Sequence, residues 1–162
     1  EEAKRGHTVA IHSASHKYNQ IYTSEQAFFD DLEQMNSIIK AQTGNDASII
    51  RFPGGSSNTV SKDYCPGIMT QLVNDVTARG LLYCDWNVSS GDANSKPIST
   101  EQVVQNVISG VQSHNVSVVL QHDIKDFSVN AVEQIIQWGQ ANGYTFLPLT
   151  TSSPMSHHRI NN

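Results

Sequence analysis

The chain has 162 residues, of which 38% are hydrophobic and 15% charged, and its formal net charge is -5. This length suits one domain with a substantial core, and we expect residues 1–162 to form a single, partial domain. The acidic balance and the lack of a basic stripe argue against nucleic acid and anionic membrane as partners. No apolar run reaches the length of a membrane span, and no signal peptide opens the chain.

The first six residues, Glu1–Gly6, are typical of the last turn of a helix that ends at a glycine. Because a domain seldom begins in this way, we expect earlier strands of the same domain to be absent from this chain. The strand expected at residues 8–11 would then have an open edge, which tends to recruit another strand. We therefore expect either a separate N-terminal fragment of the same domain or self-association through this edge.

Strand and helix patterns alternate along the rest of the chain. Short β-rich runs predict strands at residues 8–11, 48–51, 81–86, 116–120 and 144–149. Apolar residues at helical spacing predict helices at about residues 23–44, 66–80, 99–111 and 128–143. Three residues are expected to cap these helices at their N-terminal ends: Thr23, Ser99 and Ser128. This alternation indicates an α/β fold with a parallel sheet, and five strands are too few for a closed eight-stranded barrel.

The stretch His12-Ser13-Ala14-Ser15-His16 follows directly after the first predicted strand. Two imidazoles four residues apart lie on one face of a helical turn, close enough to share a metal ion. With seven histidines in 162 residues, about 0.3 pairs with this spacing are expected by chance. A surface pair without a ligand is therefore the alternative interpretation.

Other residues that can carry chemistry follow the ends of the later strands. In chain order they are Arg51, Trp86, Asp92 and His122. The carboxyl ends of parallel strands lie at one edge of a sheet, so we expect these residues on one rim with the histidine pair. Taken singly, Arg51 could pair with a surface acid, Trp86 could belong to the core, and His122 could bond to Asp123.

The chain has two cysteines, Cys65 and Cys84, which are too few and too far apart in sequence for a zinc knuckle. They could form a disulfide in an oxidising compartment or remain two buried thiols. Of these two states we expect the thiols.

Four motifs occur in a fixed order: His12-Ser-Ala-Ser-His16, Arg51-Phe-Pro-Gly-Gly55, Trp86 with Asp92, and Leu120-Gln-His122. In this order they resemble the polysaccharide deacetylases with a NodB-type domain, carbohydrate esterase family 4. The resemblance covers nearly the whole chain and implies a distorted (β/α) barrel, N-terminally incomplete here, that binds Zn²⁺ or a similar divalent ion. It also implies N-deacetylation of an N-acetylglucosamine polymer such as peptidoglycan or chitin, outside the cell or at the cell wall.

The resemblance implies a role for each motif, and the chemistry of amide hydrolysis needs the same residue types. The roles are metal binding for His12 and His16, substrate or oxyanion contact for Gly54, Trp86 and Leu120, and catalysis for His122, Arg51 and Asp92. Gly54 would act through its backbone N–H. Arg51 would orient the catalytic aspartate, and Asp92 would hold and tune His122, the general acid.

The chain departs from the family in two places. The family motif Thr-Phe-Asp-Asp-Gly, which supplies the general base and the third metal ligand, is absent from the strand ends of this chain. Phe29-Asp30-Asp31-Leu32 lies within a predicted helix, and we interpret it as a solvated helix face. Ala93 stands where many members have another tryptophan. We therefore expect hydrolysis to need an N-terminal segment not present here; a catalytically silent carbohydrate-binding module and a metal-binding interaction domain are the alternatives.

Overall fold

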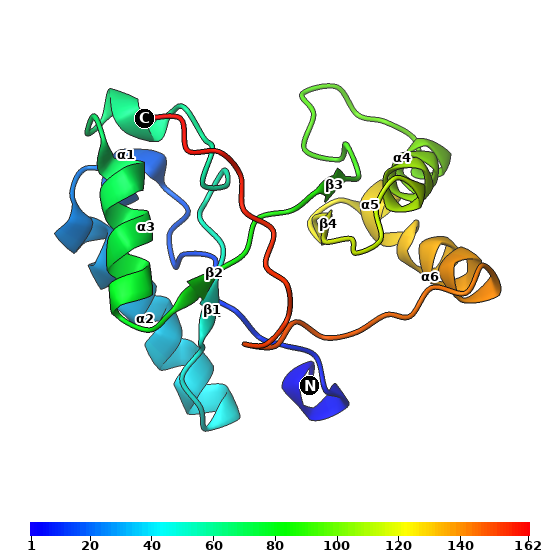
Figure 1. Cartoon of the computed structure of the whole chain (residues 1–162), viewed down its shortest axis with the longest axis horizontal. Helices are drawn as coiled ribbons and strands as arrows, with labels where there is room; N and C mark the ends of the chain where they lie inside the picture. The colour runs from blue at the N-terminus through cyan, green and yellow to red at the C-terminus, as the bar shows by residue number, and fades with distance from the viewer. The chain divides into compact units, whose positions relative to one another are not determined.

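The computed structural model describes all residues, 1–162, which form two compact units. The first unit comprises residues 1–85 and 148–162, and the second comprises residues 86–147 (Figure 1). Strands and helices alternate in both units, so the predicted α/β class is confirmed. That residues 1–162 form a single domain stays a prediction. None of the helices combines the length and the apolar character that a membrane crossing requires.

A short parallel sheet organises the first unit. β1 (Ile49–Ile50) pairs with β2 (Leu82–Tyr83) along one side, and Ile11 forms a single parallel bridge to Ile50 along the other. The predicted strand at residues 8–11 is thus reduced to one paired residue, because only Ile11 bonds to β1 through both its amide and its carbonyl. Association through this edge stays a prediction.

The first unit contains α1 (Tyr18–Ile21), α2 (Glu25–Thr43), α3 (Ile68–Ala78) and two 3-10 helices at Ala3–Arg5 and Ser61–Asp63. The two long helices, α2 and α3, begin and end within two residues of the predicted positions, whereas α1 and the 3-10 helix at Ser61–Asp63 were not predicted. The N-cap of α2 is Ser24 and not the predicted Thr23, because the hydroxyl of Ser24 accepts the hydrogen bond from the Ala27 amide. It ends at Gly44 in the left-handed conformation, and Gly6 closes the first 3-10 helix in the same way.

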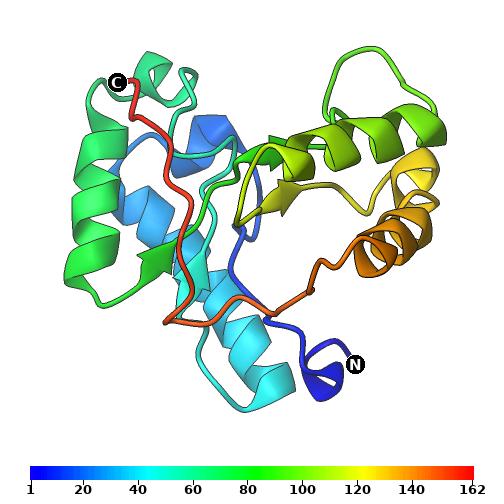
Figure 2. The same ribbon diagram turned by 45° about the vertical axis from the view of Figure 1, so that its right-hand side comes forward.

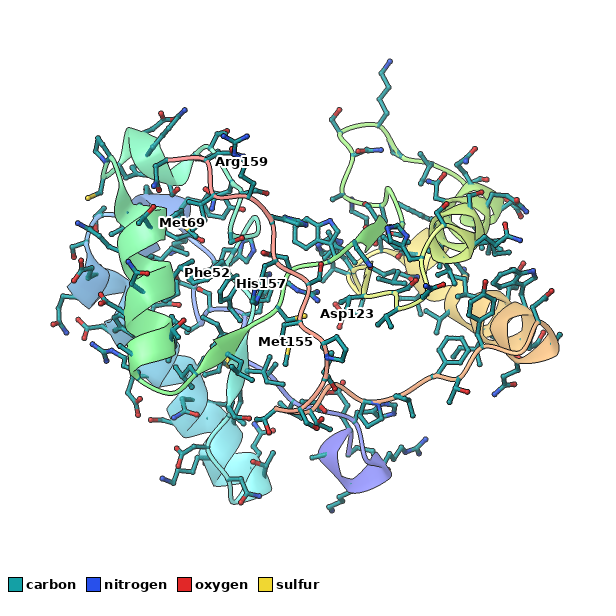
Figure 3. All side chains as sticks on the ribbon, in the orientation of Figure 1. Phe52, Met69, Asp123, Met155, His157 and Arg159 are labelled. Carbon is teal, nitrogen blue, oxygen red and sulfur yellow. The ribbon has the colours of Figure 1, made fainter.

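The core of the first unit packs around this sheet, α2 and α3 (Figure 1). Phe52 and Met69, labelled in Figure 3, are completely buried there. The ring of Phe28 from α2 lies 5.4 Å from the ring of Phe52. Cys65 and Cys84 are free thiols, as expected. This packing gives the loops after Ile11 and β1 a rigid base.

The C-terminal segment, residues 156–162, packs against the first unit although it has no regular structure. The amide of Asp85 donates to the Ser156 carbonyl at 2.7 Å. The ring of His157, labelled in Figure 3, stacks on Tyr83 with 4.0 Å between ring centroids. This C-terminal segment is therefore part of the first unit.

The second unit has its own parallel pair of strands, β3 (Val88–Ser89) and β4 (Val119–Leu120). Its helices are α4 (Thr100–Gln112), α5 (Asp126–Val129) and α6 (Val132–Ala141). α4 and α6 are in contact, as both views show (Figures 1 and 2). Ser99 caps α4 as predicted, with its hydroxyl accepting the Gln102 amide. Of the strand predicted at residues 81–86, only Leu82–Tyr83 (β2) forms a strand, and β3 begins after it, at Val88 in the second unit.

Two further predictions are wrong. The helix predicted from Ser128 is interrupted, and the Ser128 hydroxyl donates to Asp92 instead of capping a helix. Residues 144–149 form no strand, because no neighbouring strand pairs with them. Tyr144 instead stacks on Trp138 of α6, with 5.3 Å between ring centroids.

Candidate active site

His12 and His16 lie on an irregular loop before α1, and not on a helical turn as predicted. Ser13 (φ 71°) and His16 (φ 54°) adopt left-handed backbone conformations, which interrupt a helix. The two imidazoles nevertheless converge, with ring centroids 5.0 Å apart and an angle of 61° between the planes. Nδ1 of His12 lies 2.9 Å from the Arg51 carbonyl oxygen. A carbonyl only accepts, so Nδ1 carries the proton and Nε2 presents its lone pair.

The carboxylate of Asp31, in α2, accepts three hydrogen bonds from this loop. Its Oδ1 accepts from the Ser13 hydroxyl at 2.5 Å and the Ala14 amide at 2.8 Å, and its Oδ2 accepts from the Ser15 amide at 2.9 Å. The Ser13 hydroxyl oxygen in turn accepts from the His16 amide at 2.9 Å. These bonds satisfy the loop amides without a helix, which explains why the predicted helical turn does not form.

The interpretation of Asp30 and Asp31 as a solvated helix face is wrong for Asp31, which is half-buried. A signal for this was present in the sequence. Asp31 is three residues after Phe28 and four before Met35, so it lies on the apolar stripe of α2. Burial raises the pKa of Asp31, but the hydroxyl and amide donors of the loop outweigh burial and hold the pKa below its ordinary value. The carboxylate is therefore ionised at neutral pH.

Arg51 follows β1, and its guanidinium bonds to the end of β2. Nε donates to the Cys84 carbonyl at 3.0 Å, and Nη2 donates to the Asp85 carbonyl at 3.3 Å. These bonds tie together the two chain segments that leave the sheet at its carboxyl end. That Arg51 orients a catalytic aspartate stays a prediction.

Gly54 lies in the exposed turn after Pro53, in the left-handed conformation with φ 78°. The turn closes through the Gly55 amide, which donates to the Phe52 carbonyl at 2.8 Å and leaves the Gly54 amide outside this bond. A Cβ on Gly54 would lie 2.5 Å from the Tyr18 hydroxyl, so only glycine permits this approach. The Tyr18 ring is also 5.6 Å from that of His16, and thus contacts both the predicted oxyanion turn and a predicted ligand.

A second carboxylate missed in the sequence supports this turn. Asp85 is completely buried and accepts from the Ser56 amide at 2.8 Å, the Ser56 hydroxyl at 2.5 Å and the His158 amide at 2.9 Å. The Ser57 hydroxyl lies 3.0 Å from Nδ1 of His158. The only signal in the sequence was an acid at the end of an apolar strand, which must be hydrogen-bonded if buried. Its partners come from two distant segments.

In the second unit, Asp92 binds His122 through both carboxylate oxygens. Oδ1 lies 2.8 Å from Nδ1 of His122, while Oδ2 accepts from the His122 amide at 2.6 Å and the Ser128 hydroxyl at 2.6 Å. The Lys125 ammonium donates to the Asp92 carbonyl. The predicted pair of His122 and Asp92 is therefore present, and His122 is held by this residue and not by the neighbouring Asp123.

Asp92 is only 2% exposed. Burial raises its pKa, but hydrogen bonds from Ser128 and His122 outweigh this and lower the pKa from 3.8 to about 2. The carboxylate is therefore ionised at neutral pH and accepts the Nδ1 proton of His122, so Nε2 is the ring nitrogen that can exchange a proton with another molecule.

Leu120 and Trp86, the two predicted substrate contacts, both belong to the second unit. Leu120 ends β4 and accepts a hydrogen bond from the Ser90 amide at 3.0 Å, which fixes the strand two residues before His122. Both side chains are half-buried. The rim predicted to unite these residues with the histidine pair stays a prediction.

His12 and His16 fit a divalent ion such as Zn²⁺ as two nitrogen ligands. Their rings converge, and a ligating imidazole usually donates its other N–H to a carbonyl or carboxylate, as Nδ1 of His12 does to Arg51. No group of three or more His, Cys, Asp or Glu side chains in the chain is arranged to hold a metal. The chemistry available is therefore partial metal ligation and a backbone N–H donor in one unit, and a proton-transferring imidazole in the other.

Known proteins are similar to this chain in sequence and fold. A family model described as polysaccharide deacetylase matches residues 1–65, which include the histidine pair and the Gly54 turn. The peptidoglycan-N-acetylglucosamine deacetylase of Bacillus cereus (strain ATCC 14579) is 29% identical over 149 residues, which cover 90% of this chain and 51% of that protein. The chain thus spans about half the length of this relative.

Two solved structures agree closely with the fold. The catalytic domain of peptidoglycan N-acetylglucosamine deacetylase from Eubacterium rectale ATCC 33656 is 98% identical, with a TM-score of 0.98 over 99% of this chain and 73% of that one. A polysaccharide deacetylase from Bacillus cereus is 28% identical, with a TM-score of 0.78 over the same shares of the two chains. The predicted distorted (β/α) barrel is confirmed by these similarities, and the chain belongs to the polysaccharide deacetylase family.

Proposed function

We propose that this chain carries catalytic groups of a metal-dependent deacetylase, which hydrolyses the N-acetyl groups of an N-acetylglucosamine polymer. The names of the similar proteins from Bacillus cereus and Eubacterium rectale favour peptidoglycan over chitin as that polymer. With peptidoglycan as substrate, the site of action would be outside the cytoplasm, at the cell wall.

The observation that carries this proposal is the pair of His122 and Asp92. Cleavage of an amide releases an amine, which leaves far more readily when a proton is delivered to its nitrogen. His122 suits this step, because Asp92 fixes the ring through Nδ1 and through the backbone amide. The fixed ring presents Nε2 in one orientation, and its side chain is 34% exposed, so a substrate can reach it.

The groups of the first unit suit the other half of the reaction. A divalent ion held by His12 and His16 would polarise the acetyl carbonyl and activate the attacking water. The Gly54 amide lies in an exposed turn and would donate to the carbonyl oxygen as it gains negative charge. Asp85 supports that turn by accepting hydrogen bonds from the Ser56 amide and hydroxyl. The general base would come from the N-terminal segment that carries the Thr-Phe-Asp-Asp-Gly motif of the family.

The test is acetate release from peptidoglycan and from N-acetylglucosamine oligomers with Zn²⁺ present. It is run on this chain and on a chain of the length of the Eubacterium rectale catalytic domain. In whichever form is active, we expect His122→Ala to reduce turnover by at least about 100-fold, as the loss of an acid catalyst does. Zn²⁺ affinity, measured by chelator competition, should stay within about 2-fold of the parent.

Other results would change the assignment. Loss of Zn²⁺ binding in His122→Ala would make His122 a ligand. Binding of the polymer without acetate release in either form would favour the carbohydrate-binding module. Asp123→Ala is the matched control, because Asp123 is exposed and adjacent to His122, and it should keep full activity.

A further inference from the structure

The loop of residues 12–17 has no strand or helix to fix its backbone, yet it carries both imidazoles of the proposed metal site. Two of its residues, Ser13 and His16, are in the left-handed region, which side chains other than glycine rarely adopt. Such conformations persist only where the surroundings impose them. The loop therefore depends on contacts from outside itself.

Asp31 provides most of these contacts from the rigid helix α2. Its two carboxylate oxygens accept from one hydroxyl and two successive amides, those of Ser13, Ala14 and Ser15. The Ser13 hydroxyl links Asp31 to His16, because it donates a hydrogen bond to Asp31 and accepts one from the His16 amide. A continuous chain of hydrogen bonds thus runs from α2 to the backbone of the second histidine.

The other end of the loop is fixed independently. Ile11 is paired with β1, and Nδ1 of His12 bonds to the Arg51 carbonyl. His12 is thus set by the sheet, whereas His16 is set through Asp31. The 5.0 Å separation of the two rings requires both.

We propose that Asp31 is a positioning residue of the metal site, which makes the imidazoles of His12 and His16 converge by fixing the backbone between them. The proposal rests on the proposed function, in which these two imidazoles bind the metal. Asp31 itself bonds to the loop and is not assigned as a ligand.

The geometry requires a carboxylate and not merely a polar side chain. Every group that Asp31 contacts is a donor, and both of its oxygens accept. An asparagine in its place would have one oxygen and one NH₂ group, so at least one loop donor would face another donor. Residues that orient metal-bound histidines typically change metal affinity by about 10- to 100-fold when removed.

The test compares Asp31→Asn with Asp30→Asn, since Asp30 is the exposed neighbour on the same helix. Zn²⁺ affinity is measured by chelator competition, and the Co²⁺ form is examined by its visible absorption, which reports coordination geometry. We expect Asp31→Asn to weaken Zn²⁺ binding by about 10- to 100-fold and to change the Co²⁺ spectrum. Asp30→Asn should do neither, and both variants should keep the helical circular dichroism of the parent.

A readout without metal separates this proposal from the proposed function. In the metal-free chain, ring protons of His12 and His16 should show a nuclear Overhauser effect, which Asp31→Asn should lose. The Ala14 and Ser15 amides should also exchange faster with solvent in that variant. Retention of the ring contact and of parental Zn²⁺ affinity in Asp31→Asn would overturn the proposal. Failure of both this chain and the longer form to bind Zn²⁺ would instead refute the proposed function, and the ring contact would still decide the role of Asp31.

Discussion

Asp92 offers a quantitative test of how the second unit is stabilised. Its pKa is about 2 in the folded protein and 3.8 ordinarily, so folding favours the ionised form. The difference corresponds to about 2 kcal/mol of folding free energy. Because the folded pKa is the lower one, this contribution is complete above about pH 5 and is lost as the pH falls through about 4 toward 2.

Asp92→Asn removes the charge and keeps the shape. We expect its free energy of unfolding at neutral pH to be lower than that of the parent by about 2 kcal/mol, and the two proteins to converge as the pH falls below about 3. Both tryptophans, Trp86 and Trp138, lie in the second unit, so their fluorescence during urea denaturation reports on the unit that contains Asp92.

Asp123→Asn is the control, since it removes a nearby exposed carboxylate of the same unit. Its urea midpoint should follow that of the parent at every pH. The argument would be refuted if Asp92→Asn and the parent differed by the same free energy at about pH 3 as at about pH 7. It would also be refuted if the two proteins unfolded at the same urea concentration at neutral pH.

Two further predictions concern the Gly54 turn. Gly54→Ala should lower the thermal unfolding midpoint more than Gly44→Ala, because both strain a left-handed residue but only the first places a Cβ against the Tyr18 hydroxyl. If the two variants lowered the midpoint measured by circular dichroism equally, the contact with Tyr18 would be unimportant. Tyr22→Phe should cost about 1–2 kcal/mol in chemical denaturation, because the buried Tyr22 hydroxyl donates to the Pro53 carbonyl at 2.7 Å; a parental free energy of unfolding would contradict it.

The local signals of the sequence were accurate where neighbouring residues decide the structure. The apolar spacing of α2 and α4, the glycine end of α2 and the serine cap of α4 were all predicted within one or two residues. The order of the four motifs was sufficient to identify the family, and the pairing of Asp92 with His122 followed from it. These features depend on residues close in sequence or on motifs read in order.

The errors occurred where a distant residue competes with a local preference. Serine is a residue type that often caps helices, but the Ser128 hydroxyl donates to the buried Asp92, 36 residues earlier. The reason is that burying an ionised carboxylate without hydrogen-bond donors would cost more free energy than leaving the helix uncapped. The same competition decides the histidine loop. His12 and His16 have the spacing of a helical turn, yet the Asp31 carboxylate accepts hydrogen bonds from the Ser13 hydroxyl and the next two amides, and no helix forms.

The sequence by itself therefore determined the residue types of the site and the class of fold that carries them. Only the tertiary structure decided the backbone of the loop of residues 12–17 and the importance of Asp31 and Asp85. The physical reason is that a buried carboxylate needs hydrogen-bond donors, and these come from whichever segments the fold brings within about 3 Å of its oxygens. Which segments these are depends on the folded chain as a whole, and helical or strand periodicity in the sequence does not predict them.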